Sequence, residues 1–107
     1  MSTAKEVMDK IASKLKANPE KTKGVEKKIA INLTGEEAGR WLVDCTQNPA
    51  QVKLDANTRA DMTVTMAADD MQKMIQGDLD PQTAFLTGKV KIDGDLGLAL
   101  KLGKILG

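Results

Sequence analysis

The sequence of 107 residues lacks most of the side chains that enzymes use for chemistry. It contains no histidine, and its only serines are Ser2 and Ser13, in or beside the first predicted helix. A Ser-His-Asp or Cys-His site therefore has no general base. Metal sites built on histidine and cysteine are excluded for the same reason. The residues predict a protein that is not an enzyme and that uses no metal.

Aromatic residues and an excess of charge are also missing. Aromatics make up 2% of the chain, and 16 basic against 15 acidic residues give a net charge of +1. A nucleic-acid-binding protein needs a concentrated basic face, usually with aromatic stacking residues, so no nucleic-acid partner is predicted. The glycines of GDLGLALKLG do not follow a nucleotide-binding spacing, and no cofactor is predicted.

Cysteine and long apolar runs are equally scarce. The single cysteine, Cys45, excludes an internal disulfide and fits a reducing compartment. It alternates with Trp41 and Val43 on the apolar face of a predicted strand, so we expect a small core residue rather than a nucleophile. No apolar run approaches the ~18 residues of a membrane span, and the N-terminus is amphipathic rather than signal-like. These features predict a cytoplasmic domain.

The residues that are present alternate in two different periods. Residues 3–17 repeat apolar positions at helical spacing, whereas residues 25–34, 40–45, 52–55, 62–66 and 89–93 alternate apolar and polar side chains as strands do. Further helices are predicted over residues 68–76, 81–87 and 95–106. The expected fold is a single α+β domain, residues 1–107, in which a five-stranded, mostly antiparallel sheet is covered on one face by helices.

The C-terminal segment has more apolar surface than a helix on a sheet requires. If residues 96–106 form one helix, its leucines, isoleucine and alanine spread over an arc of roughly 220°, about twice the usual width. Four of the six methionines fall between Met62 and Met74, and methionine adapts to ligands of varied shape. The alternative is that methionines merely fill an aromatic-poor core. Both features together favour an apolar cavity between the two layers.

The segment LDPQTAFLTGKVKIDGDLGLALKL, with the preceding DMTVTMAADDMQKMIQGDLD, resembles the signature region of the sterol carrier protein 2 family. The likeness extends more weakly over the rest of the chain. It implies a hydrophobic tunnel under the helices and a non-enzymatic intracellular carrier of fatty acids, fatty acyl-CoA or sterols. The alternative is an accessory module that holds a lipid for a partner enzyme of lipid metabolism.

The resemblance also assigns residues to the tunnel. It places Gln82, Phe85 and Leu86 in a helix that lines it, with Phe85 expected to be buried and Gln82 either reaching a polar group of the ligand or facing water. The helix that closes the tunnel holds Leu98, Leu102, Ile105 and Leu106. The inward sides of the strands and of the other helices complete the set. The candidate ligand-binding residues are Trp41, Met62, Val64, Met66, Met71, Met74, Ile75, Gln82, Phe85, Leu86, Leu98, Leu102, Ile105 and Leu106.

Location and assembly follow from the same reasoning. Relatives from animals commonly end in a peroxisomal tripeptide of the SKL type, whereas this chain ends in ILG, so peroxisomal location is the second choice. We expect a monomer. Residues 1–28 hold eight lysines and four acids, which raises transient contact with anionic membranes as an alternative to a simply solvated helix.

Overall fold

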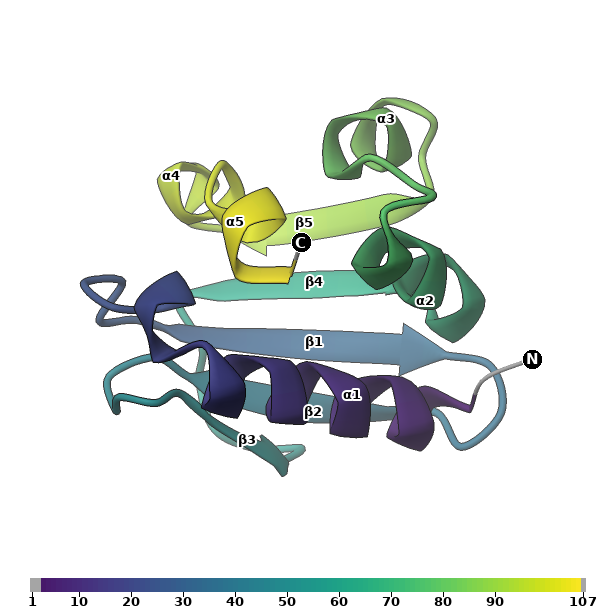
Figure 1. Ribbon diagram of the computed structural model, residues 1–107. Helices are drawn as coiled ribbons and strands as arrows, with labels where there is room; N and C mark the ends of the chain where they lie inside the picture. Colours follow the sequence, from purple (N-terminus) through teal and green to yellow (C-terminus); the bar gives the residue numbers. More distant parts are fainter. Residues whose placement is uncertain (1–2, 107) are drawn as a thin grey trace.

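The computed structural model describes residues 3–106. One long helix leads into four strands, and shorter helices then alternate with the last strand (Figure 1). The elements in chain order are α1 (Ala4–Ala17), the 3₁₀ turn η1 (Pro19–Lys21), β1 (Lys28–Thr34), β2 (Gly39–Asp44), β3 (Gln51–Leu54), β4 (Met62–Ala67), α2 (Ala68–Gln76), α3 (Pro81–Leu86), β5 (Val90–Gly94), α4 (Leu96–Ala99) and α5 (Leu102–Leu106).

The five strands form one sheet in the order β3-β2-β1-β4-β5. Three of the four pairings are antiparallel, and β1 pairs with β4 in parallel. The predicted fold, α+β with a mostly antiparallel five-stranded sheet, is confirmed. The parallel pair arises because the chain returns from the edge strand β3 to the centre of the sheet before it forms β4.

The helices lie on one face of the sheet. Helix α1 runs in front of β1 and β2, α2 and α5 lie over β4, and α3 and α4 lie beside β5 (Figure 1). The inward side chains of neighbouring strands form continuous rows, because Ile29 pairs with Met62, Ile31 with Val64, and Leu33 with Met66. All six are buried, and they form the floor of the core.

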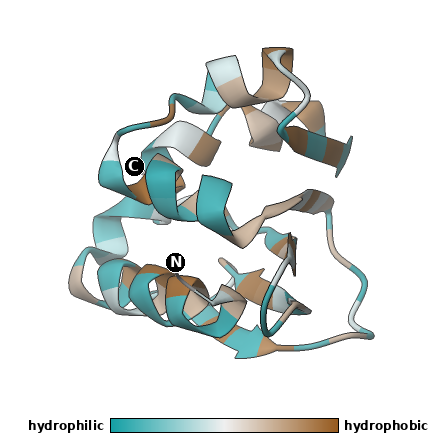
Figure 2. Ribbon diagram, turned by 90° about the vertical axis from the view of Figure 1, so that its right-hand side faces the viewer, coloured by the Kyte–Doolittle hydropathy of each residue, from teal (hydrophilic) through white to brown (hydrophobic). Residues whose placement is uncertain are grey.

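Helix α1 begins at a side-chain cap. The Glu6 backbone N–H donates to Thr3 Oγ1 at 3.2 Å, and the Thr3 hydroxyl donates to Glu6 Oε1 at 3.1 Å. Hydrophilic and hydrophobic residues alternate along the helix (Figure 2), and its apolar side packs into the core, as the spacing predicts. The buried residues of α1 are Ala4, Val7, Met8, Ile11 and Leu15.

The outer face of the sheet is less uniformly polar than the alternation predicts. Ala30 and Leu42, which pair across β1 and β2, are both buried on this face. The next residues along the same row are Lys53 opposite Leu42 and Thr63 opposite Ala30. Both apolar residues lie on strands with a neighbouring strand on either side, where adjoining side chains cover more of the surface than at an edge.

The C-terminal segment differs from the single helix that we expected. It forms two short helices, α4 and α5, that change direction at Leu100 and Lys101. The Lys101 N–H donates to the Leu98 carbonyl at 3.0 Å, a tighter turn than an α-helix makes, and the Ile105 N–H donates back to Lys101 at 3.0 Å. A glycine precedes the first of these helices: a Cβ at Gly94 would lie 2.5 Å from the Asp61 carbonyl oxygen, and its φ is +106°.

The loop between β3 and β4 is held by Asp55 and Arg40. Asp55 accepts hydrogen bonds from the Thr58 hydroxyl at 2.6 Å and from the backbone N–H groups of Thr58 and Asn57 at 2.8 and 2.9 Å. The Arg40 guanidinium donates to the carbonyls of Asp55 and Thr58. The Thr58 hydroxyl and the two N–H groups hold the pKa of the Asp55 carboxyl well below its usual range.

This pKa shift predicts a pH-dependent loss of stability in Asp55→Asn. The carboxylate contributes its full stabilisation above the unfolded-state pKa of about 3.9 and loses it as the pH falls through the lower folded-state pKa. The variant should therefore unfold at lower urea concentration than the parent at pH 7, and the gap should narrow below about pH 4. Asp93→Asn is the control, because within residues 3–106 the Asp93 side chain makes no hydrogen bond or ion pair. A gap that stays constant down to pH 2 would contradict this account.

Candidate functional site

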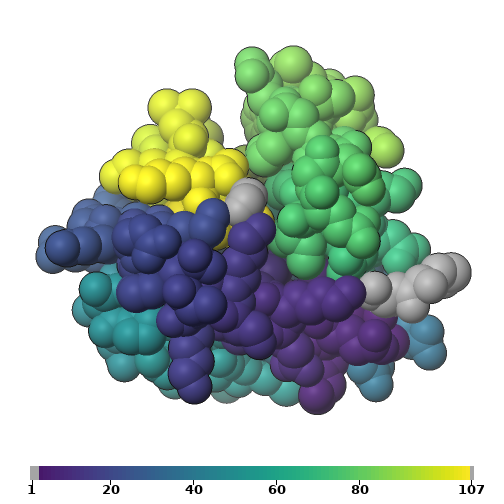
Figure 3. All heavy atoms as spheres, viewed as in Figure 1, coloured from purple at the N-terminus to yellow at the C-terminus, as the bar shows by residue number. Residues whose placement is uncertain are grey.

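A cavity of about 630 Å³ opens at the β5 side of the molecule. Figure 3 shows the surface hollowed between the part formed by α3 and the part formed by α4 and α5. The volume lies in the range of small-molecule sites, which run from about 300 to 1,000 Å³. The cavity lies between the sheet and the helices, where the tunnel is predicted, but it has the form of an open groove.

The floor and walls of the cavity are almost entirely apolar. Strands β4 and β5 provide the floor, α2 one side, and the segments around α3, α4 and α5 the rest. Asp80 and Gln82 supply the only polar side chains among the lining residues, which are Val64, Met66, Met74, Asp80, Pro81, Gln82, Phe85, Leu86, Val90, Ile92, Leu96, Ala99, Leu100, Leu102, Gly103 and Leu106.

Both polar side chains are exposed and stand in the first turn of α3 or at its cap. Asp80 accepts the Thr83 N–H at 3.0 Å and the Thr83 hydroxyl at 3.3 Å, so its carboxylate serves as the N-cap of the helix. The Gln82 side chain makes no hydrogen bond within residues 3–106. The interior therefore offers only apolar contacts, and the polar side chains of the lining are exposed.

Three contacts of Asp95 fix the opposite wall of the cavity. Asp95 accepts the Leu98 N–H at 3.1 Å, which caps α4, and forms an ion pair with Lys27. The hydrogen bond between Lys27 and Asp95 raises the pKa of the lysine and lowers that of the carboxyl. The Asp95 N–H also donates to the Asp61 carbonyl at 3.0 Å, which ties α4 to the start of β4.

Eight of the fourteen predicted binding residues line this cavity. They come from β4, α2, α3 and α5, all in the C-terminal half of the chain. The eight are Val64, Met66, Met74, Gln82, Phe85, Leu86, Leu102 and Leu106. Their role in binding stays a prediction, to which the cavity gives a location.

The other six predicted residues do not reach the cavity. Met62 and Met71 are fully buried in the core, so the methionine cluster divides between core and cavity. Leu98 and Ile105 are buried as well and belong to the hydrophobic core. Trp41 is buried on β2, beyond β1, and Ile75 packs at the margin of the core.

Phe85 corrects one expectation. The sequence predicts a buried phenylalanine, as core or tunnel wall, whereas the structure leaves 51% of it exposed at the opening of the cavity. It lies on α3, a helix of six residues that packs against the edge strand β5 and buries only Ala84. A short helix at the edge of a sheet leaves its larger side chains partly in water.

Several lining residues were not predicted. Val90 and Ile92 alternate with polar residues on β5. This two-residue period predicts that both side chains face the helices, but it does not indicate that they line a cavity. Leu96, Ala99 and Leu100 were counted in the apolar arc, but a straight helix does not show which part of the arc faces a cavity. The sequence indicates Asp80 and Pro81 only as the start of a helix. They do start α3, and they also line the cavity.

The single cysteine, Cys45, lies in the core and not among the residues that line the cavity. Cys45 is buried, as predicted, and burial raises the pKa of its thiol to about 11, with Asp44 adding to the shift. Over residues 3–106, no three histidine, cysteine, aspartate or glutamate side chains are grouped to hold a metal ion. No helix in the same range has the length and apolarity to cross a bilayer.

Comparison with known proteins shows which sequences and structures this chain is similar to. The chain is 43% identical over 91 residues to hydroxysteroid dehydrogenase-like protein 2 of Xenopus laevis, covering 84% of this chain and 22% of that protein. It is 41% identical over 75 residues to sterol carrier protein 2 of Gallus gallus, covering 70% of this chain and 14% of that protein. The chain thus spans about a fifth or less of the length of these curated relatives.

A solved structure extends the likeness to the fold. Sterol carrier protein 2 of Aedes aegypti, in complex with the C16 fatty acid palmitate, superimposes with a TM-score of 0.75 at 25% identity and covers 100% of this chain and 97% of that one. The model of the SCP-2 sterol transfer family matches residues 6–107. With this match over nearly the whole chain, the protein belongs to the SCP-2 sterol transfer family.

Proposed function

We propose that this protein is a non-enzymatic lipid carrier that holds the apolar part of a fatty acid, fatty acyl-CoA or sterol in the cavity between β4, β5 and the helices. The observation that carries the proposal is an open cavity of about 630 Å³ with apolar walls and with its two polar side chains exposed at the opening. Such a site grips an alkyl chain by contact area and leaves the head group near water. The Aedes aegypti relative in complex with palmitate supports this ligand class.

A second candidate is an accessory module that presents a lipid to an enzyme. It is favoured by the relatives in which the matching region is only about a fifth of a protein named after a dehydrogenase. Transfer of lipid between vesicles by the isolated protein supports the carrier, whereas stable co-purification with one enzyme supports the module. The carrier is proposed to act as a cytoplasmic monomer, which fits its single, buried cysteine.

Chain length is the first test of the proposed ligand class. Each methylene that enters an apolar cavity gains about 0.8 kcal/mol, or roughly fourfold in affinity. In titrations of the purified protein with saturated fatty acids, affinity should rise by about that factor per methylene until the cavity is filled and then level off. Mass spectrometry of co-purified lipid identifies the natural ligand. Affinity that is independent of chain length would contradict the proposal.

Phe85→Ala tests the opening of the cavity. Because about half of the side chain is already exposed, the free energy of unfolding should fall by no more than about 1 to 2 kcal/mol, less than the ~3 to 5 kcal/mol of a core phenylalanine. Fatty-acid affinity should fall several-fold, because the ring lines the cavity. Phe85→Leu should restore most of the affinity. A core-sized loss of stability with unchanged affinity would place Phe85 in the core instead.

Met66→Ala and Met62→Ala form a matched pair on β4. Both side chains point inward from the same strand and are almost fully buried, but only Met66 lines the cavity. Each variant should lose about 2 to 5 kcal/mol in urea unfolding. Met66→Ala alone should shift the preferred fatty-acid chain length upward, because it enlarges the cavity. An equal shift in Met62→Ala would show that the ligand reaches further into the core than the cavity does.

A further inference from the structure

The lining of the cavity contains one charged side chain, and its charge is negative. Asp80 is an exposed carboxylate, Gln82 is neutral, and the other lining residues have no polar side chain. No lysine or arginine of residues 3–106 is among them. A ligand with a carboxylate head group therefore meets no cation in the lining and one charge of its own sign.

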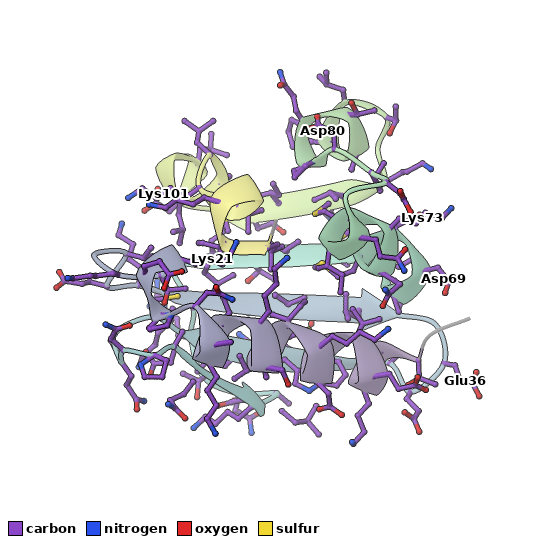
Figure 4. All side chains as sticks on the ribbon, in the orientation of Figure 1. Lys21, Glu36, Asp69, Lys73, Asp80 and Lys101 are labelled. Carbon is purple, nitrogen blue, oxygen red and sulfur yellow. The ribbon has the colours of Figure 1, made fainter. Side chains whose placement is uncertain are left out.

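The lysines of this part of the chain do not reverse that balance. Residues 77–106 hold four lysines and four aspartates, so the region around the cavity has no net positive charge. Lys101 lies across the opening from Asp80 (Figure 4), but neither Lys101 nor Lys104 lines the cavity. Both are exposed, and water and salt screen exposed charges. The charge that belongs to the site itself is that of Asp80.

Asp80 keeps one carboxylate oxygen available for a ligand. The N–H and the hydroxyl of Thr83 both donate to Oδ2, at 3.0 and 3.3 Å. Within residues 3–106 the other oxygen, Oδ1, accepts no hydrogen bond, and the carboxylate forms no ion pair. An ionised carboxylate can only accept hydrogen bonds. Oδ1 therefore suits a head group that donates a hydrogen.

The backbone at the start of α3 offers little to an anion. A helix start usually presents free N–H groups, which bind anions well. Here Pro81 has no N–H, and the N–H of Thr83 already donates to Asp80. The helix is also only six residues long. Neither side chains nor backbone therefore form a carboxylate site at this side of the opening.

We propose that the cavity selects long-chain lipids with a neutral hydroxyl head group over lipids with a carboxylate, and that Asp80 determines this selectivity. The ligand hydroxyl donates to Asp80 Oδ1 and accepts from the side-chain amide of Gln82, which lies in the same turn of α3 and lines the cavity. The inference rests on the proposed carrier function, which supplies the binding of the alkyl chain. Fatty acids enter by the same chain, with lower affinity.

Three ligands with the same alkyl chain separate the head groups. Dodecanol donates a hydrogen, methyl dodecanoate is neutral but has no donor, and dodecanoate is an anion. Their hydrophobic contributions are nearly equal, because the chain that enters the cavity is the same. In titrations at low ionic strength, dodecanol should bind about tenfold more tightly than dodecanoate, with the ester between them. An ester that binds as tightly as dodecanol would overturn the assignment of a hydroxyl donor.

Asp80→Asn removes the charge and keeps the helix cap. Asparagine caps a helix about as well as aspartate does, so urea unfolding should be nearly unchanged. Affinity for dodecanoate should rise about threefold at low ionic strength, and affinity for dodecanol should fall about threefold. Asp78→Asn is the control: it removes an exposed aspartate two residues away that does not line the cavity, and it should bind both ligands as the parent does. Equal changes for the two ligands in Asp80→Asn would indicate a merely structural effect and overturn the proposal.

Gln82→Lys tests whether the head group lies at α3 at all. The substitution places a cation beside the carboxylate, and lysine is a good helix former. Affinity for dodecanoate should rise several-fold at low ionic strength, and high salt should reduce this gain. An affinity for dodecanoate that does not respond to the added charge would place the head group elsewhere and overturn the proposal.

The same titrations keep the two proposals apart. Equal affinity of the parent for dodecanol and dodecanoate, unchanged in Asp80→Asn, would overturn the selectivity and leave the carrier function standing. Absent binding of all three ligands, by a protein that still unfolds cooperatively in urea, would overturn the carrier function and the selectivity that rests on it. A preference for dodecanol that Asp80→Asn removes and Asp78→Asn retains would support both.

Discussion

The sheet is wider than its helices can cover, and the position of the cavity depends on this mismatch. Five strands spaced about 4.8 Å apart span roughly 24 Å, and a helix with its side chains covers about 10 Å. Helix α1, with four turns, closes the core over β1 and β2, but only short helices face β4 and β5. Their ends do not meet over β5, and the uncovered apolar floor becomes the cavity. A longer second helix would have made a better core and no site.

Burial, rather than the polar contacts, holds the short helices at the cavity. Leu98, Leu102, Ile105 and Leu106 are almost completely buried, whereas exposed ion pairs such as Lys27 with Asp95 contribute little to stability. The polar contacts set direction instead: Asp95 fixes where α4 starts, and the Lys14 ammonium donates to the Leu106 carbonyl at 3.4 Å, which joins α5 to α1. Apolar packing therefore provides the attachment, and hydrogen bonds determine the orientation.

Sequence patterns predicted what depends on neighbouring residues. The two-residue period of β4, the Thr3 cap of α1 and the Asp80-Pro81 start of α3 are local signals, and the structure has each of them. The parallel pairing of β1 with β4 depends on residues more than thirty positions apart, and no local pattern indicates it. The direction change at Leu100 also escaped prediction, because the apolar residues on either side of it fit a continuous helix equally well. Leu98 is buried and Leu100 is exposed beside the cavity, so the candidate set includes both lining residues and core residues that a straight helix does not distinguish.

The exposed apolar side chains at the cavity carry a cost that a purely structural protein would avoid. Phe85, Leu86, Leu96 and Leu100 oppose solubility while they stand in water, yet all four line the cavity, where the apolar chain of a bound ligand would cover them. Local rules of folding are most often broken where function requires it. The same reasoning accounts for the composition of the cavity: its interior is apolar and its two polar side chains are exposed, and a carrier of the kind that we propose must release its ligand unchanged.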